Sequence, residues 1–320
     1  MTRHIGLSFG RIEHWHDGVG EYTRQLAFAL AERAPTLLRE QGWRLHYHLP
    51  RQWHGLFGDA VNYLDTHTLQ RFVHLRAKRF DLWHTLHQHI RLRAPCGTRY
   101  QLETVLDLNF LHSKSPAKAE HYRRRLRRRV NRRDAVVAIS HYVAGDIERE
   151  LAPLATPVQV IHIGATDLSE MPREPVRGAP AVPFLLHVSR MAPSKNVAAL
   201  IALAAAWPDK PLVLTGPRSP YTDSLREEVD ARGLSNVSMH LDVSDAQKAW
   251  LFAHCEGFVF PSFAEGFGLP PLEAMHFGKS VFLSRLTSLP EVGGAAAHYF
   301  DSFDGPSMRA TVEAGLVGDA

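Results

Sequence analysis

The sequence predicts an α/β protein with two parallel-sheet domains. Short apolar runs alternate with amphipathic segments along most of the 320 residues, which is typical of parallel strands joined by crossover helices. This alternation stops once, at a proline-rich stretch from residue 168 to residue 183, and then begins again. A chain of this length with 45% hydrophobic residues can bury two cores.

The first domain is predicted to span residues 1–167. Its strands are expected at Ile5–Phe9, Trp43–Leu49, Leu82–Leu86, Gln101–Leu106, Ala135–Ile139 and Val158–Ile163. Its helices are expected at Glu21–Arg33, Ala117–Arg133 and His141–Leu151. Ligands of such sheets bind at the carboxyl ends of the strands, so the segments that follow strands are the first candidates for a site.

Residues 168–183 contain four prolines and no apolar period, and they are predicted to form an interdomain linker. The second domain is predicted to span residues 184–320. Its strands are expected at Phe184–Val188, Leu212–Thr215, Val237–Leu241, Gly257–Phe260, Ser280–Leu283 and Ala297–Phe300. Its helices are expected at Val197–Ala206, Ser224–Arg232 and Ala246–Ala253, with another beginning near Pro270. We therefore expect two Rossmann-like domains that face each other across a cleft.

Charge is distributed unevenly along the chain. Residues 1–167 have a net charge of +9 and the remainder a net charge of −5, which suggests that the first domain meets an anionic partner or surface. Cys96 and Cys255 do not make a disulfide framework, so a cytoplasmic location is expected. No apolar run approaches the ~20 residues that span a bilayer.

The most specific motif runs from Pro261 to Met275. Glu265 should lie on a glycine-flanked loop, and Glu273 about one turn into the helix that follows, because prolines favour the first turn of a helix. Glycines let backbone amides approach a ligand, and a helix N-terminus favours anions. The pattern suits a ligand with hydroxyls at both ends and a diphosphate between them, such as a nucleotide-sugar. In the alternative interpretation, Glu265 is solvated and Glu273 only complements the helix dipole.

A second motif, from Val188 to Val197, follows the first strand of the second domain. Arg190 is expected at the strand end and Lys195 at the start of the next helix, so two cations and free amides would converge on one phosphate site. The alternative is a pair of solvated surface cations. No D-x-D motif occurs, so we expect Arg190, Lys195 and helix dipoles, rather than a metal or other cofactor, to meet a diphosphate.

Together these motifs resemble the donor site of retaining glycosyltransferases of family 4, which have the GT-B fold. The resemblance extends over most of the chain and is densest from Phe184 to Asp301. It implies that Arg190 and Lys195 bind the diphosphate and that Glu273 holds the ribose. The loop residues that would meet sugar and phosphate are Glu265, Gly266, Phe267, Gly268 and Leu269. In the first domain the family's glycine-rich turn corresponds to Gly18 and Gly20, beside the donor phosphates and the acceptor.

The sequence departs from the family at the end of the strand Gln101–Leu106. Relatives commonly carry His-Asp there, with the histidine facing the reacting sugar, whereas this chain has Leu106 followed by Asp107. Leucine can neither form hydrogen bonds nor transfer protons. We expect Asp107 to contribute to catalysis and His112 to replace the missing histidine; His84 and His87 are the alternatives.

The segment Arg123–Arg133 is unusually basic. It has no accompanying set of stacking aromatic residues and no recognised nucleic-acid-binding module, so a nucleic-acid partner is not expected. The two remaining interpretations are peripheral attachment to an anionic membrane surface and a solvated helix face.

The combined prediction is a retaining hexosyltransferase that acts in cell-surface polysaccharide or lipopolysaccharide synthesis. It would move a hexose from a nucleotide diphosphate donor to a glycan or lipid-linked acceptor. A sugar-nucleotide 2-epimerase of the same fold and a catalytically silent nucleotide-sugar-binding protein are the alternatives. Relatives usually continue into terminal helices after the last strand, so the sequence also suggests a chain truncated at its C-terminal end.

Overall fold

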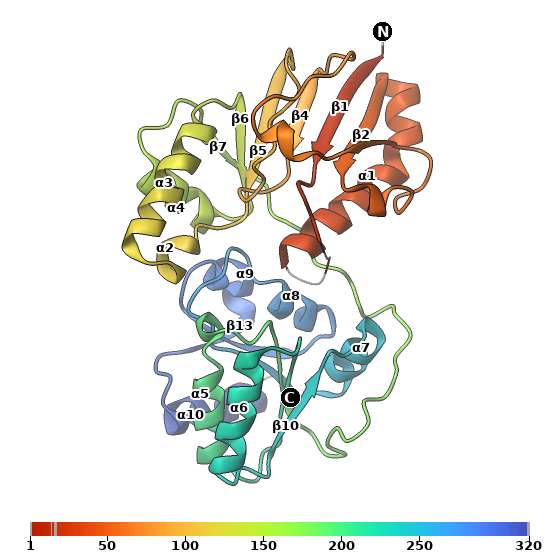
Figure 1. Cartoon of the computed structure of the whole chain (residues 1–320). Helices are drawn as coiled ribbons and strands as arrows, with labels where there is room; N and C mark the ends of the chain where they lie inside the picture. The colour runs from red at the N-terminus through yellow and green to blue at the C-terminus, as the bar shows by residue number, and fades with distance from the viewer. Residues whose placement is uncertain (1, 14, 16–17, 319–320) are drawn as a thin grey trace. The chain divides into compact units, whose positions relative to one another are not determined.

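The computed structural model describes residues 2–13, 15 and 18–318, and the side chain of His112 is also outside this description. Two compact units, Met1–Ile163 and Gly164–Ala320, divide the chain (Figure 1). Both are α/β units built on parallel sheets, as predicted.

The N-terminal unit contains a seven-stranded parallel sheet with the strand order β3-β2-β1-β4-β5-β6-β7. Its strands are β1 (Arg3–Ser8), β2 (Trp43–Leu49), β3 (Asn62–Asp65), β4 (Leu82–Thr85), β5 (Tyr100–Val105), β6 (Ala135–Ala138) and β7 (Val158–Val160). β1 pairs with both β2 and β4, so the order of the sheet reverses between β1 and β4. Such a switch point is where open α/β sheets bind ligands.

Helices and short 3₁₀ turns connect these strands. They are α1 (Gly18–Gln41), η1 (Arg51–Trp53), η2 (Thr68–Arg71), α2 (Phe110–Ser113), α3 (Pro116–Val130) and α4 (His141–Leu151). α1 packs small residues such as Ala27 and Ala31 into a core with Phe9 and Tyr47, and the Tyr47 hydroxyl donates to the Ala27 carbonyl at 2.6 Å.

The C-terminal unit contains a six-stranded parallel sheet with the strand order β10-β9-β8-β11-β12-β13. Its strands are β8 (Leu185–Val188), β9 (Leu212–Gly216), β10 (Val237–Leu241), β11 (Gly257–Phe260), β12 (Ser280–Ser284) and β13 (Ala297–Phe300). The switch point of this sheet lies between β8 and β11.

Helices cover both faces of the second sheet, so its strands are apolar on both sides. They are α5 (Val197–Ala206), α6 (Pro220–Ala231), α7 (Asp245–His254), α8 (Leu269–His276), α9 (Leu289–Gly293) and α10 (Gly305–Gly318), with short turns η3 (Pro193–Lys195) and η4 (Gly294–Ala296). Leu185 packs in a core with α5, α6 and α10, and its neighbour Leu186 packs on the other face with residues of α7 and α8.

Three features differ from the sequence prediction. The predicted linker packs on the C-terminal unit, because Leu168 and Val176 are buried in its core. Helix α3 ends at Val130 rather than at Arg133, because Asn131 caps it. After β13 the chain forms α10, a helix whose Met308 and Val312 are buried against the sheet. Within the described ranges, no helix combines the length and apolarity that crossing a membrane demands.

Candidate functional site

The predicted donor loop follows β11, at the switch point of the C-terminal sheet. Its backbone is held by residues that follow β12: the Ser288 hydroxyl donates to the carbonyls of Glu265 and Phe267 at 3.2 and 2.7 Å, and the Glu265 amide donates to Thr287 Oγ1 at 3.1 Å. Gly268 has a φ of 120°, and a Cβ there would lie 2.9 Å from a Leu289 methyl carbon. Only glycine fits this conformation and space, so the loop geometry is fixed before α8 begins.

Lys195 and Glu265, seventy residues apart in the sequence, form an ion pair. Lys195 Nζ lies 2.5 Å from Glu265 Oε1, and the two side chains are only 16% and 11% exposed. The loops that carry them are also joined through the Ser194 carbonyl, which accepts from the Phe263 amide at 2.8 Å and the Ser262 hydroxyl at 3.1 Å. The structure therefore brings together one predicted phosphate cation and the predicted sugar-orienting carboxylate.

The position of Lys195 corrects one expectation. It was expected to enter the next helix, but it lies in η3, and α5 begins only at Val197. Between them Asn196 adopts a left-handed conformation with a φ of 53°, and Met191 at the start of the same loop has a φ of 44°. Such non-glycine conformations carry strain and cluster at functional sites.

Arg190 lies just beyond the end of β8 and is exposed. It makes no hydrogen bond or ion pair with any described residue, unlike Lys195. The turn that presents it is anchored by His187, which is fully buried. His187 Nδ1 donates to the Val259 carbonyl at 2.9 Å, and its Nε2 lies 2.7 Å from Ser189 Oγ, which accepts from the Met191 amide at 2.9 Å.

Burial holds the pKa of His187 at about 4, so this histidine is neutral at pH 7. A neutral ring can donate at Nδ1 and accept at Nε2, which is the pattern that its two partners require. The strand β9 also approaches this turn closely: a Cβ on Gly216 would lie 1.9 Å from the Ser189 carbonyl oxygen. The backbone under Arg190 is thus rigidly placed.

Glu273 lies on α8, as predicted, and its side chain is buried. Lys248 of α7 approaches it with its Nζ 3.9 Å from Glu273 Oε2, and the same Nζ lies 3.2 Å from Asp245. Burial of Glu265 contradicts the interpretation in which this carboxylate is solvated. Lys248 was not identified from the sequence, because it belongs to neither of the two motifs.

The predicted glycine turn of the N-terminal unit forms the first turn of α1. Gly20 is buried, and a Cβ there would lie 2.8 Å from the Trp15 backbone, so close packing explains this glycine. Gly18 is exposed with open space around it, so packing does not explain it.

The end of β5 is occupied by structural contacts. Leu106 is buried and its amide donates to Gln88 Oε1 at 3.0 Å. Asp107 Oδ1 accepts from the Asn109 amide at 3.0 Å and from Gln88 Nε2 at 3.3 Å, as a turn residue does. His84, an alternative to His112, makes a hydrogen bond with Thr104 Oγ1 at 2.8 Å, and burial holds its pKa at about 4.

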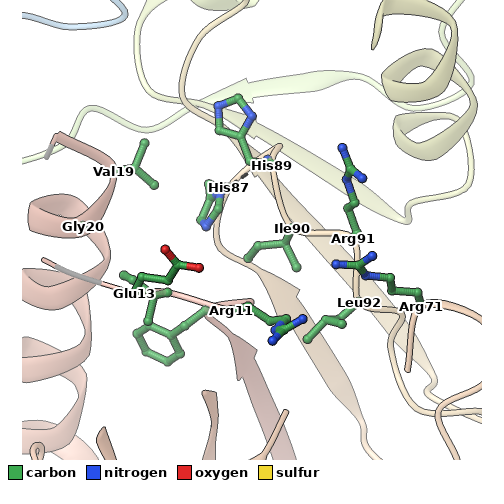
Figure 2. Close-up of a pocket in the computed structure, with 12 residues that line it drawn as sticks. Arg11, Glu13, Val19, Gly20, Arg71, His87, His89, Ile90, Arg91 and Leu92 are labelled. Atoms are coloured by element: carbon green, nitrogen blue, oxygen red, sulfur yellow. Dashed lines mark hydrogen bonds between the residues drawn. The ribbon is translucent and has the colours of Figure 1, made fainter. Parts of the chain in front are cut away.

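A pocket of about 390 Å³ opens at the switch point of the N-terminal sheet (Figure 2). It is lined by the segment after β1, the end of η2, the first turn of α1 and the segment after β4. Figure 2 shows Arg11, Arg71 and Arg91 on three separate segments around it, with Glu13 on the side of α1. Sequence reasoning missed these arginines because no local spacing links loops so far apart in the chain.

His87 also lines this pocket, but its contacts assign it a structural role. Its Nδ1 accepts from the His89 amide at 3.3 Å. Burial lowers the pKa of His87 to about 3, so it carries no charge at pH 7.

Comparisons with known proteins match part of the chain to a described family. The model of the family described as Glycosyl transferases group 1 matches residues 174–299. The chain is 36% identical over 143 residues to O-antigen chain mannosyltransferase B of Escherichia coli, a match that covers 43% of this chain and 38% of that protein. It is 34% identical over 145 residues to the serotype-specific mannosyltransferase WbdA of Escherichia coli, covering 43% of this chain and 18% of WbdA.

These matches span less than half the length of both curated relatives. Among solved structures, Anabaena HepE in complex with UDP and glucose superposes with a TM-score of 0.73. The superposition covers 99% of this chain and 93% of that one, with 16% sequence identity, and is a likeness of fold.

Proposed function

We propose, from the match of residues 174–299 to the model of the glycosyl transferases group 1 family, that the chain transfers a hexose from a nucleotide diphosphate sugar to a glycan or lipid-linked acceptor. The fold is α/β of the GT-B class, as predicted from sequence. Both matched relatives are named as mannosyltransferases, one of them of the O-antigen chain, which supports mannose as the hexose and surface polysaccharide synthesis as the context.

The observation that carries this proposal is the cluster at the β8–β11 switch point. Lys195 and Glu265 are paired there at 2.5 Å, and Arg190 projects from the adjacent strand end. Glu273 is buried on the helix that follows the Glu265 loop. A ligand bound there would meet cations and a carboxylate at one end and a second carboxylate further along α8, which matches the order of chemical groups in a nucleotide-sugar.

The roles follow from the chemistry of each group. Arg190 and Lys195 stabilise the negative charge that develops on the departing diphosphate, which is usually the largest catalytic contribution in such a reaction. Glu265 orients the sugar hydroxyls, and Glu273 accepts hydrogen bonds from the ribose. The backbone from Gly266 to Leu269 meets the sugar and phosphate. The departing diphosphate and the incoming hydroxyl share one face of the sugar, so the anomeric configuration is retained.

Binding of nucleoside diphosphates tests this assignment. Titration calorimetry with GDP, UDP and ADP is performed on the wild type and on Arg190→Ala, Lys195→Ala and Glu273→Ala. Each variant removes a charge-assisted partner worth ~1.5–3 kcal/mol, so affinity for the preferred nucleotide should fall about tenfold or more. Lys210→Ala is the matched control, because Lys210 forms an ion pair with Glu256, also at 2.5 Å, elsewhere in the same unit. If Arg190→Ala, Lys195→Ala and Glu273→Ala all bind the nucleotide with wild-type affinity, the donor binds elsewhere.

A catalytically silent nucleotide-sugar-binding protein is the second candidate, and the buried Leu106 favours it. A same-fold 2-epimerase would instead convert the donor without an acceptor. Analysis of products from the donor alone and from the donor with a mannosylated lipid acceptor separates the three: the transferase gives acceptor-dependent transfer, the epimerase a new nucleotide-sugar, and the binding protein no turnover.

A further inference from the structure

The pocket of the N-terminal unit has an excess of positive charge above an apolar floor. Arg11, Arg71 and Arg91 line it, and Glu13 is the carboxylate among its lining residues. The remaining walls are largely apolar, with Phe9 and Ile90 among them. Arginine is the side chain best suited to planar, bidentate recognition of phosphate and carboxylate groups.

Backbone contacts fix two of these arginines in place. The Arg93 amide donates to the Gln70 carbonyl at 2.9 Å, which ties η2 to the segment after β4 and brings the backbones of Arg71 and Arg91 to the same side of the pocket. Gln70 is itself buried, and its side-chain oxygen lies 2.9 Å from His48 Nε2. Arg71 Nε is buried without a hydrogen-bond partner among the described residues, which is costly for a charged group unless a ligand supplies an acceptor.

The nearby buried carboxylate does not neutralise this cluster. Glu103 is fully buried on β5 and is shared by Arg129, at 2.5 Å, and Arg133, at 2.9 Å. Burial holds the pKa of Arg125 of α3 below its usual value, and the cations of Arg91, Arg129 and Arg71 lower it further. Cations in this corner repel one another, and a bound anion would relieve that repulsion.

Arg129 acts on the pocket through the backbone. Its guanidinium donates to the Ile90 carbonyl at 2.5 Å and to the Gln88 carbonyl, so it holds the segment that carries His87, Ile90 and Arg91. The pocket wall is therefore anchored to β5 through Glu103 and to α3 through Arg129.

We propose that this pocket binds a phosphate ester carried by the acceptor, with Arg71 and Arg91 as its principal ligands and Arg11 at its rim. This inference rests on the proposed function and deepens it, because it gives the acceptor a chemical class. The volume of about 390 Å³ lies within the range of small-molecule sites and is large enough for a sugar phosphate. The apolar floor would contact a sugar face or the first carbons of a lipid chain. The phosphate ester belongs either to a soluble phosphosugar or to the head of a lipid diphosphate.

The test is titration calorimetry on the full chain with four probes: inorganic phosphate, glucose 6-phosphate, farnesyl diphosphate below its micellar concentration, and glucose as the uncharged counterpart. We expect at least one phosphate ester to bind and glucose not to bind. Arg71→Gln with Arg91→Gln should weaken that binding about tenfold or more. Arg91→Gln alone, at an exposed position that the fold tolerates, should weaken it severalfold.

Two control variants separate this site from surface charge and from the donor site. Arg128→Gln with Arg132→Gln removes the same charge from exposed positions on and just beyond α3, and should change probe affinity less than twofold. Lys195→Ala should weaken nucleotide binding, and it should leave unchanged the part of probe binding that the Arg71/Arg91 variant removes. Preference for glucose 6-phosphate or for farnesyl diphosphate identifies the source of the phosphate, and either supports the proposal.

Equal affinity of the wild type and the Arg71/Arg91 variant for every probe overturns the inference, as does glucose binding as tightly as its phosphate. Failure of the donor assignment has a different signature, namely nucleotide affinity that is insensitive to Lys195→Ala. The two proposals therefore fail independently.

Discussion

Acidification is expected to destabilise the C-terminal unit through His187, the buried histidine that anchors the turn beneath Arg190. The ring is fully buried, and its pKa is about 4 in the folded protein against an ordinary value of 6.5. As the pH falls, His187 takes up a proton in the unfolded chain before it does so in the folded protein. The contribution of neutral His187 to the free energy of unfolding is therefore complete above pH 6.5 and is lost progressively as the pH falls toward 4. With these two values, the loss between about pH 7.5 and about pH 5 is about 2 kcal/mol.

The perturbation that isolates this effect is His187→Gln, which keeps an amide able to donate and accept but cannot titrate between these pH values. Urea unfolding is followed at both pH values by hydrogen exchange in peptides that contain β8 and β11. This readout reports the C-terminal unit separately, since burial also lowers the pKa values of His46 and His48 in the other unit. The variant should be less stable than the wild type at neutral pH, because its side chain is shorter, but should lose about 2 kcal/mol less on acidification.

His254→Gln is the control, because this histidine is exposed on the last turn of α7. It should show the acid sensitivity of the wild type. Nucleotide binding should weaken only as the pH approaches 4, because His187 of the folded protein takes up its proton there. The protonated ring cannot accept from Ser189, and the turn that carries Arg190 would rearrange. If His187→Gln loses as much stability on acidification as the wild type, the neutral buried histidine is not the cause and the reasoning is refuted.

Three further predictions follow from the proposed function. Transfer activity should persist in excess EDTA, because protein cations rather than a metal meet the diphosphate; loss of turnover that Mg²⁺ restores would contradict this. Sedimentation with anionic vesicles should show binding that high salt and the Arg128→Gln/Arg132→Gln variant both weaken, whereas equal binding to neutral vesicles would exclude an electrostatic attachment. His112→Ala should lower turnover ~10²-fold with nucleotide affinity unchanged, while Leu106→His should restore nothing and should lower the urea midpoint, because that position is buried.

The sequence predicted strands and helices well where an apolar run has clear boundaries. The helix Val197–Ala206 was predicted at its observed bounds, where the sequence is a uniform apolar run. The first helix was predicted to end at Arg33, since Pro35 reads as a terminator, yet α1 continues through Pro35 to Gln41. The edge strand β3 was missed, because its four residues, Asn62–Asp65, show no apolar run.

The donor site was predictable because its residues follow consecutive signals along the chain. Arg190 and Glu265 each come just after an apolar strand, and the carboxyl ends of parallel strands lie at one edge of a sheet. The pairing of Lys195 with Glu265 was not predicted, because it depends on β8 and β11 being neighbours in the sheet. In the sequence, the strands β9 and β10 and the helices α5, α6 and α7 lie between them.

The partners of the basic segment Arg123–Arg133 could not be predicted from the local sequence. From sequence it reads as a helix with cations on most faces, which suggested a surface for an anionic membrane. In the structure Arg129 and Arg133 turn inward onto Glu103, a carboxylate on a strand about 30 residues earlier in the chain. Arg123 is paired with Glu120 at 2.7 Å. The cations still available to a membrane are thus fewer than the sequence count implies.

Two groups of arginines in the N-terminal unit, those buried on Glu103 and those that line the pocket, are therefore connected. The ion pair with Glu103 offsets the cost of burying Arg129, and the guanidinium of Arg129 also donates hydrogen bonds to the carbonyls of Gln88 and Ile90. Those carbonyls belong to the segment that presents Arg91 to the pocket. Removing a partner from a buried ion pair costs ~3–5 kcal/mol, so Glu103 cannot be lost without loosening that segment. Part of the positive charge seen in the sequence therefore lies in a buried support, Arg129 and Arg133 on Glu103, and part lies in the three arginines that line the pocket.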